Sequence, residues 1–311
     1  MKKALVFGAG GFAGGHLVNE LVSNNYEVYG CSRYGKITDK RYAGAMVCDI
    51  MDVDRVKTVI AEVNPDYIIN MAGISSVGLS WKIPQTTIDV NVVGPVNILE
   101  TVKETNPDAH ILFIGSSEEY APKAEPISEV DRLDANNPYG ISKVMLERLV
   151  SLYRDHYGMH VHYVRAFNHT GIGQADTFVV PSWCKQVAEI SVSGKPGTIR
   201  VGNLNVARDF SDVRDVVRAY RMVLESDDCS QIYNICSGKA IYLEKILEFI
   251  TSMSEQPVEI EVNQKLIRPV ENDTIFGDHS KITKDLGWEP EIDLKDTIRE
   301  MYEDFVSRKR S

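Results

Sequence analysis

Tyr139 and Lys143 are the two residues whose types and spacing best suit proton transfer in this 311-residue chain. Asn137 and Pro138 precede them and predict a helix start, with asparagine as the cap and proline at the first position. Residues four apart share one helix face, and a cation beside a phenol favours the phenolate. The pair therefore predicts a lowered pKa for Tyr139, which would donate or accept a proton near neutral pH. With 14 tyrosines in the chain the pattern also arises by chance, so its position must support it.

Ser116 is the third residue that we expect in this site. It follows a predicted strand over Ala109–Ile114, in the run Gly115-Ser116-Ser117. The carboxyl ends of parallel strands converge on one crevice, which would bring Ser116 to the helix that begins near Tyr139. We expect its hydroxyl to hydrogen-bond the substrate oxygen that Tyr139 protonates. The three residues together predict a Ser–Tyr–Lys site for hydride transfer.

The first residues of the chain predict a dinucleotide site. An apolar strand at residues 4–7 runs into a glycine cluster, and an apolar helical face follows at Leu17, Val18 and Leu21. Glycines let backbone N–H groups approach a pyrophosphate at the start of the helix. The spacing fits both Gly-x-Gly-x-x-Ala and Gly-x-x-Gly-x-x-Gly. The residues that we expect at the cofactor here are Gly8, Gly10, Gly11, Phe12, Ala13 and Gly14.

The next strand indicates which dinucleotide is preferred. Strand Tyr26–Gly30 is followed by Cys31, Ser32 and Arg33, without the acidic residue that usually binds the ribose hydroxyls of NAD. Arg33 can face a 2′-phosphate and Ser32 can hydrogen-bond it, which predicts that NADP(H) is accepted and preferred over NAD(H). Arg33 can equally stack on the adenine and tolerate both cofactors.

Strands and helices alternate through the first half of the chain. We predict strands at Tyr26–Gly30, Asp66–Asn70, Ala109–Ile114 and His160–Arg165, and helices at Val53–Val63, Pro84–Glu104 and Tyr139–Tyr157. This alternation predicts an α/β fold: a Rossmann-type, doubly wound parallel sheet with a smaller C-terminal α/β substrate lobe. We expect residues 1–165 plus 213–254 in the core, 166–212 plus 255–290 in the lobe, and a C-terminal helix in 291–311. Met71, Ala72 and Gly73 follow one strand, and we expect them at the cofactor because the small residues Ala72 and Gly73 let it come close. Plain turn chemistry explains them equally.

Composition excludes several classes of function. The formal net charge of −10 argues against nucleic acid as a partner. No apolar run approaches the roughly 20 residues of a membrane helix, and the one near the N-terminus is too short for a signal peptide. The histidines show no metal-binding pattern, so no metal is expected. Five cysteines without a Cys-x-x-Cys spacing fit reduced thiols in a cytoplasmic protein.

Taken together, the motifs resemble the extended short-chain dehydrogenase/reductases that act on nucleotide sugars, over essentially the whole chain. Within that family the chain is most similar to the GDP-mannose branch, which holds GDP-4-keto-6-deoxymannose reductases and GDP-mannose 4,6-dehydratases. Besides the glycine loop and the Tyr139/Lys143 pair, the segments that carry the resemblance are 49–52, 75–81, 116–120, 165–171, 201–204, 208–215, 234–238 and 268–271.

The resemblance implies further site residues. On the cofactor side these are Asp49 and Ile50 at the adenine and Asn91 near the nicotinamide; Asn91 can also be simply a buried, satisfied amide. On the substrate side they are Ser75, Ser116, Ser117, Asn168, Lys185, Gly202, Asn203, Arg208, Arg268 and Glu271. Arg208 and Arg268 would grip the diphosphate, because guanidinium groups suit phosphate oxygens. The plainer alternatives are ion pairs of these arginines with Asp209 or Glu271, and a solvated Lys185.

The implied activity is reduction of the C4 ketone of a GDP-4-keto-6-deoxy-hexose, to a product of the GDP-6-deoxy-D-mannose or GDP-rhamnose type. The alternatives are a GDP-mannose 4,6-dehydratase, another 4-epimerase or dehydratase of nucleotide sugars, and a non-catalytic cofactor sensor. Glu118 stands where the dehydratases carry a catalytic base, but Ser116 replaces their usual threonine. In a simpler interpretation Glu118 only binds a sugar hydroxyl, with Glu119 solvated beside it.

The resemblance also implies a homodimer. The family commonly pairs the two long helices, here predicted at Pro84–Glu104 and Tyr139–Tyr157, into a four-helix bundle. A second copy would cover any apolar stripe that these helices leave outside. The alternative is a monomer in which the stripes face only the sheet.

Overall fold

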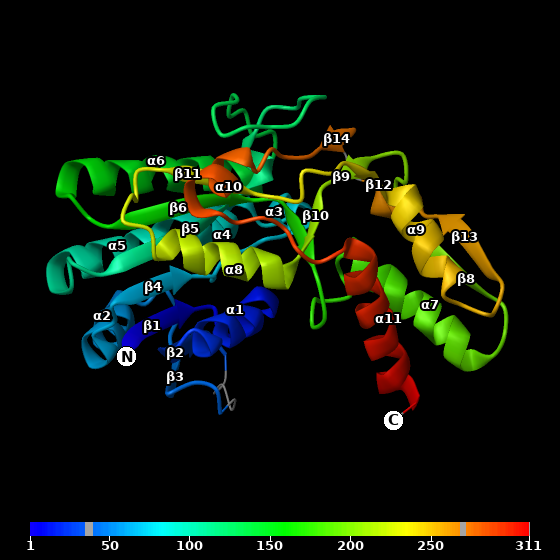
Figure 1. The fold of residues 1–311 in the computed structure, drawn as a ribbon, viewed down its shortest axis with the longest axis horizontal. Coiled ribbons are helices and arrows are strands. Elements are labelled where there is room, and N and C mark those ends of the chain that lie inside the picture. The colour runs from blue at the N-terminus through cyan, green and yellow to red at the C-terminus, as the bar shows by residue number, and fades with distance from the viewer. Residues whose placement is uncertain (35–39, 268–271, 311) are drawn as a thin grey trace.

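A parallel β-sheet lies at the centre of the structure, a computed structural model that describes residues 1–34, 40–267 and 272–310 (Figure 1). Within these residues the sheet has seven strands in the order β11-β6-β5-β4-β1-β2-β3, all paired in parallel. The strands are β1 Lys2–Phe7, β2 Tyr26–Ser32, β3 Gly44–Val47, β4 Tyr67–Asn70, β5 His110–Ser116, β6 Val161–Ala166 and β11 Ile232–Ile235. The order reverses between β1 and β4, which opens a crevice at their carboxyl ends. The predicted Rossmann-type α/β fold is confirmed.

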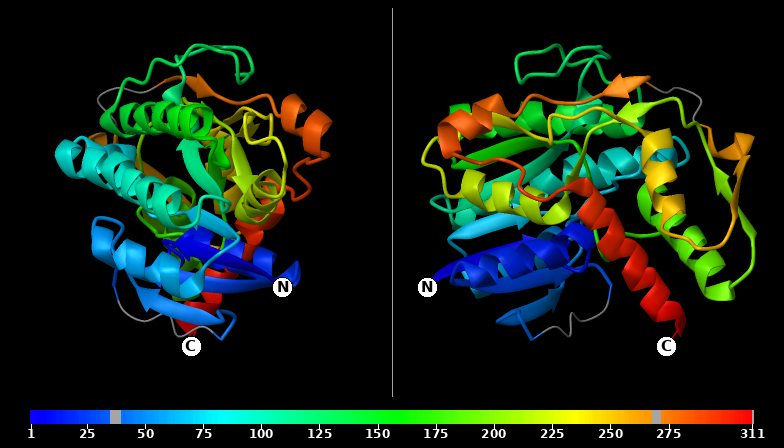
Figure 2. Two further views of the ribbon diagram at one scale, coloured as in Figure 1. Left: turned by 90° about the vertical axis from the view of Figure 1, so that its left-hand side faces the viewer. Right: turned by 45° about the vertical axis from the view of Figure 1, so that its right-hand side comes forward.

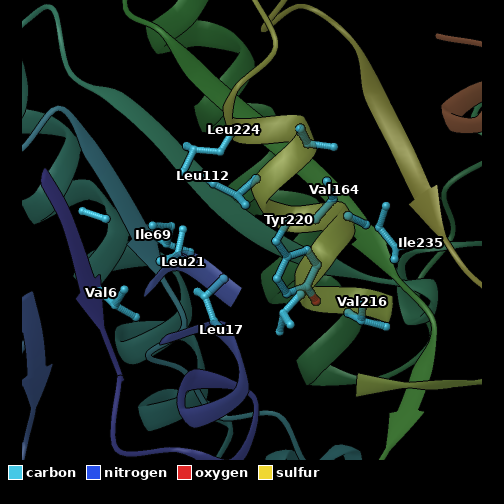
Figure 3. Close-up of a cluster of buried hydrophobic side chains, with 14 of the residues drawn as sticks. Val6, Leu17, Leu21, Ile69, Leu112, Val164, Val216, Tyr220, Leu224 and Ile235 are labelled. Atoms are coloured by element: carbon cyan, nitrogen blue, oxygen red, sulfur yellow. The ribbon is translucent and has the colours of Figure 1, made fainter. Parts of the chain in front are cut away.

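Helices cover both faces of this sheet (Figure 2, left). One face carries α1 (Phe12–Ser23), α8 (Val213–Leu224) and α10 (Ser280–Leu286), and the other carries α2 (Val53–Val63), α5 (Gly94–Thr105) and α6 (Pro138–Tyr157). Figure 3 shows the first core, in which Leu17 and Leu21 of α1 and Val216 and Tyr220 of α8 pack on the strands. Burying such side chains stabilises the fold by about 1.5–3 kcal/mol each, which fixes the strand ends where ligands bind.

A separate lobe lies to one side of the sheet, on the right in Figure 1. Its core is shared by α7 (Val179–Ser193), α9 (Leu243–Ser252) and α11 (Leu294–Arg310), with β8 (Gly197–Val201) paired in parallel to β13 (Val258–Val262). Short strands join the lobe to the sheet: β7 (Asn168–Thr170) with β10 (Phe210–Asp212), and β9 (Ala207–Arg208) with β12 (Ile241–Tyr242) and β14 (Thr274–Ile275).

Two helices pack in the unit opposite to the one we expected. Helix α9 lies within the range expected for the core, but Leu247 and Ile250 fill the hydrophobic cluster of the lobe. Helix α10 lies within the range expected for the lobe, but Ile282 and the neighbouring Trp288 fill the cluster on the sheet. The apolar spacing shows that each helix has a buried face without showing which core receives it.

The long helix expected over Pro84–Glu104 is interrupted. It consists of α4 (Pro84–Ile88), a π-helical turn at Asp89–Val93, and α5. Pro95 has no N–H to donate to the carbonyl of Asn91, and its ring would crowd that carbonyl in a regular helix. The wider turn accommodates the proline.

Candidate active site

Tyr139 stands in the first turn of α6, beside Ser116 at the carboxyl end of β5. Asn137 caps the helix as predicted, since its Oδ1 accepts from the backbone N–H of Gly140 at 2.9 Å. The backbone N–H of Tyr139 donates to Oγ of Ser80, which ends the short helix α3 (Val77–Ser80), at 3.2 Å. These two contacts fix the start of α6, and Tyr139 is only 8% exposed.

Ser116 and Lys143 meet Tyr139 at this edge. Ser116 is the last residue of β5, and its side chain hydrogen-bonds that of Tyr139. The ammonium of Lys143, one turn along α6, lies 5.8 Å from the centre of the Tyr139 ring and donates to the carbonyl of Ile114 at 2.7 Å. The structure thus brings together the three side chains that the sequence places 23 and 4 positions apart along the chain.

The prediction that the pKa of Tyr139 is lowered is wrong in this structure. Burial raises the pKa of Tyr139 above its ordinary value, and the hydrogen bond with Ser116 only partly opposes this. Burial also lowers the pKa of Lys143 to about 8, because the charged ammonium loses hydration. At neutral pH Tyr139 is therefore protonated beside a mostly charged Lys143, a state suited to giving a proton.

The two glutamates after Ser116 occupy different environments. Glu118 is half-buried, and its Oε2 accepts from the side-chain amide of Asn137 at 2.9 Å, next to Tyr139. Glu119 is fully buried rather than solvated, and its Oε1 accepts from the backbone N–H of Ser116 at 2.6 Å. A 3₁₀ turn over Ser117–Glu119 produces this difference, because it directs one side chain to the crevice and the other beneath it.

The glycine loop after β1 forms a cradle that fits a pyrophosphate. Gly8 has φ +78°, and a Cβ there would lie 2.5 Å from the backbone nitrogen of Ala72. A Cβ on Gly14 would lie 2.7 Å from the carbonyl oxygen of Gly8. Helix α1 starts after Gly11 with no capping side chain among the described residues and no acidic residue in its first turn. Its N-terminus therefore suits an anion. Gly10 lies in this loop, and Phe12 and Ala13 are the first residues of α1.

The residues expected around the adenosine lie together at neighbouring strand ends. Ser32 ends β2, and its carbonyl accepts from the backbone of Cys48 just after β3, which puts Asp49 and Ile50 beside it. The guanidinium of Arg33 lies 4.4 Å from the centre of the Tyr34 ring. A basic side chain thus stands at the end of β2, where a 2′-phosphate would be bound.

Asn91 joins two parts of the site. Its Oδ1 accepts from the backbone N–H of Ile74 at 2.8 Å, and its amide donates to the carbonyl of Ile74 and to Oγ of Ser142, both at 3.0 Å. It is 1% exposed, the satisfied amide of the plainer interpretation. By these bonds it ties the loop after β4, which contains Met71, Ala72 and Gly73, to α6.

The residues expected to bind the sugar nucleotide come mainly from the lobe and its joining strands. Asn168 lies on β7, Lys185 on α7, Gly202 and Asn203 after β8, and Arg208 on β9; Ser75 and Ser117 lie on the sheet side.

Lys185 pairs with Asp176 at 2.6 Å on the surface. Arg208 is buried, and its neighbour Asp209 accepts instead from Ser237 and from the backbone of Gly238 and Gly277. Arg268 and Glu271 lie outside the described residues.

Sequence reasoning missed the residues that support the site from behind. Ser80 and Ser142 are fully buried, and they hold Tyr139 and Asn91 respectively. Asn137 was expected only as a helix cap, yet its amide also holds Glu118. Ser80 lies in the run of residues 75–81 that carries part of the family resemblance, which is the one signal that pointed to it.

Among residues 1–34, 40–267 and 272–310, no group of three His, Cys, Asp or Glu side chains is arranged to hold a metal ion. The helices in these ranges include none with the length and apolar character needed to cross a membrane.

Comparisons with known proteins support the fold and identify the family. The family model for GDP-mannose 4,6 dehydratase matches residues 5–301. The chain is 31% identical over 265 residues to a GDP-6-deoxy-D-mannose reductase of Pseudomonas aeruginosa, covering 84% of this chain and 87% of that protein. It is 26% identical over 347 residues to a GDP-mannose 4,6-dehydratase of Yersinia enterocolitica, covering 97% and 93%.

A solved structure extends this similarity to the whole fold. RMD from Pseudomonas aeruginosa, complexed with NADPH, superposes with a TM-score of 0.87 at 29% identity and covers 99% of this chain and 100% of that one. The match spans both the sheet with its glycine loop and the lobe. On the family model, the relatives and this architecture, the chain belongs to the GDP-mannose 4,6-dehydratase family, within the extended short-chain dehydrogenase/reductases that act on nucleotide sugars.

Proposed function

We propose that the protein reduces the C4 ketone of a GDP-4-keto-6-deoxy-hexose with NADPH or NADH, giving a GDP-6-deoxy-D-mannose or GDP-rhamnose type product. The observation that carries the proposal is a protonated Tyr139 hydrogen-bonded to Ser116, in a chain similar over most of its length to a GDP-6-deoxy-D-mannose reductase. The cofactor, when bound, supplies the hydride to C4 of the sugar.

The residues of the chain handle the proton. Ser116 orients the ketone oxygen by a hydrogen bond, and Tyr139 gives its phenolic proton to that oxygen as charge develops there. The charged Lys143 stabilises the tyrosinate that remains, and we place its ammonium also at the nicotinamide ribose. Arg208 and Arg268 would hold the diphosphate, and Glu271 a ribose hydroxyl. Asn168, Lys185, Gly202 and Asn203 would line the nucleotide pocket. Ser75 and Ser117 would contact the sugar.

The second candidate is a 4,6-dehydratase, which one observation favours. Elimination needs a carboxylate base for the C5 proton, and Glu118 is held beside Tyr139 by Asn137. A dehydratase of the family also aligns with this chain over nearly its whole length. We favour the reductase because Ser116 replaces the threonine that we expect in the dehydratases and because the reductase is the more similar relative over its aligned region.

Product analysis separates these functions. The purified protein is expected to convert GDP-4-keto-6-deoxymannose and NADPH to an alcohol two mass units heavier than the ketone. It should leave GDP-mannose with NADP⁺ unchanged. Glu118→Gln should chiefly raise KM and leave hydride transfer measurable. Formation of a 4-keto-6-deoxy sugar from GDP-mannose, lost in Glu118→Gln, would make the protein a dehydratase. Inversion of the configuration at C4 of GDP-mannose, without net reduction, would make the protein an epimerase.

Cofactor preference gives a second expected result. We expect kcat/KM for NADPH to exceed that for NADH, since Arg33 stands at the end of β2 with Ser32 and no acidic residue. Arg33→Ala should remove most of this preference, by about tenfold or more, and leave kcat/KM for NADH nearly unchanged. Steady-state kinetics with both cofactors measure it. Equal values in the native protein, unaltered in Arg33→Ala, would contradict the preference.

The protein is further proposed to be a homodimer through the helical stretch from α4 to α5 and through α6. Ile141, Met145 and Leu152 form an apolar stripe along α6 and are 44%, 41% and 51% exposed. A second copy would bury this stripe, and a stable interface removes about 800 Å² from each partner. Light scattering at micromolar concentration should give twice the chain mass, and Met145→Glu should give the monomer. Ile260→Glu, at an exposed site on β13, is the control. A monomeric native protein would refute the dimer.

The free state of the cysteines supports a proposal for the cellular compartment. All five cysteines lie in the described part of the chain and are free. Four of them are buried, and Cys229 is partly exposed. Unpaired cysteines are usual in the reducing cytoplasm and rare in secreted proteins, so we place the protein in the cytoplasm.

A further inference from the structure

The carboxyl group of Glu119 lies directly behind Ser116 and takes no part in the chemistry described above. Its side chain is 0% exposed. Oε1 accepts from the backbone N–H of Ser116 at 2.6 Å, while Oγ of Ser116 accepts from the backbone of Glu118 at 3.2 Å. A Cβ on Gly115 would lie 2.4 Å from Oε1, so only glycine leaves room for the carboxyl here. Glu119 therefore fixes the backbone of Ser116 at the end of β5.

A buried tyrosine extends this contact to α6. The hydroxyl of Tyr163, on β6, lies 3.1 Å from Oε1 of Glu119 and 2.9 Å from the carbonyl oxygen of Lys143. The hydroxyl has one proton, and the Lys143 carbonyl can only accept. When Tyr163 donates to that carbonyl, its own oxygen is left to accept from the carboxyl. A neutral Glu119 can donate this bond, and an ionised one cannot.

The remaining carboxyl oxygen also favours the neutral form. Oε2 of Glu119 is buried without a hydrogen-bond partner in the described part of the chain. A carboxylate with one oxygen unpartnered in the interior costs more than a carbonyl in the same place. The acceptor carbonyl of Lys143 and the unpartnered Oε2 thus both favour a neutral Glu119.

The surrounding charges agree. From α6, Tyr139, Lys143 and Glu147 face this region, and from β6 Tyr163 and Arg165 do. Arg165 donates to both oxygens of Glu147 at 2.7 Å, so its charge is already matched. Burial and the nearby Glu147 raise the pKa of Glu119 to about 8. Arg165 also donates to the hydroxyl of Tyr120 at 2.7 Å.

We propose that Glu119, in its neutral form, is a positioning residue that holds Ser116 and, through Tyr163, the Lys143 turn of α6 in the arrangement from which Tyr139 gives its proton. Its role in turnover rests on the proposed reductase function, whereas its hold on Ser116 does not. Both contacts of Glu119 are made by Oε1. Gln keeps an uncharged acceptor for Ser116 at that position, whereas Leu keeps no hydrogen-bonding group, so the two variants separate hydrogen bonding from volume.

Kinetics test the role in turnover. At pH 7, Glu119→Gln should keep kcat within about threefold of the native value, and Glu119→Leu should lose about tenfold or more in kcat with KM and NADPH affinity within about twofold. Between pH 7 and 9 the native kcat should fall more steeply than that of Glu119→Gln, since ionisation breaks the bond to Tyr163, while Lys143 titrates in both proteins. Glu125→Gln, an exposed site, is the control.

Hydrogen exchange tests the contact without any substrate. Mass spectrometry of the peptide covering residues 115–120 should show faster exchange in Glu119→Leu than in Glu119→Gln, with β8 unchanged. Native kcat and native exchange in Glu119→Leu would overturn the proposal. Equal damage in Glu119→Gln and Glu119→Leu would overturn the neutral form. If the native protein does not reduce the keto sugar, the proposed function fails, and the exchange rates alone decide whether Glu119 holds Ser116.

Discussion

Tyr139→Phe is expected to lower kcat at least about a hundredfold, the scale for removal of a general acid, while the fold and NADPH affinity stay close to native. The phenolic oxygen hydrogen-bonds Ser116, and burial keeps it protonated at neutral pH. Phenylalanine fills the same volume and leaves the bond between the Tyr139 backbone and Ser80 in place. Single-turnover kinetics of NADPH oxidation measure the loss.

A matched variant removes a phenolic hydroxyl elsewhere. Tyr302 on α11 hydrogen-bonds Ser191 within the lobe, so Tyr302→Phe deletes one hydroxyl far along the chain from the proposed chemistry. Its kcat should remain native. A Tyr139→Phe protein that folds, binds NADPH and turns over at the native rate would remove Tyr139 from the chemistry.

Gly8→Ala is expected to weaken NADPH binding at least about a hundredfold. The backbone at Gly8 has φ +78°, and the new Cβ would lie 2.5 Å from the backbone nitrogen of Ala72 and 2.7 Å from the carbonyl carbon of Met71. Neither neighbour is a flexible side chain, so the loop itself must move, and the cradle at the start of α1 moves with it. Titration of NADPH fluorescence measures the affinity.

Gly15→Ala, in helix α1 just after the glycine loop, is the control. A Cβ at Gly15 meets no described atom within 4 Å. Alanine should leave NADPH affinity unchanged and stabilise α1 by up to about 1 kcal/mol, because it restricts the unfolded chain. Thermal unfolding of both variants checks that any loss of binding in Gly8→Ala comes from a folded protein. Native affinity in Gly8→Ala would contradict the cradle.

The sequence by itself determined the parts of this protein that depend on local rules. Helix α2 was predicted with its observed ends, because its apolar residues recur at helical spacing and Asp52 caps it. The strand, glycine loop and helix at residues 2–23 follow from an apolar run, a glycine cluster and an apolar helical face that succeed one another. The break of the long helix also has a local signal in Pro95, which cannot continue a regular helix.

Only the tertiary structure decided which surfaces pack together and how far their side chains are shielded from solvent. The apolar faces of α9 and α10 fit either hydrophobic core by their spacing, and only packing assigns them. The pKa of Tyr139 is raised, not lowered, because desolvation depends on atoms from several elements that no motif records. Glu118 and Glu119 are adjacent and identical in type, yet one faces the crevice and the other is buried beneath Ser116. Residue type and spacing specify candidate chemistry, whereas burial and long-range contacts set the protonation and position from which it acts.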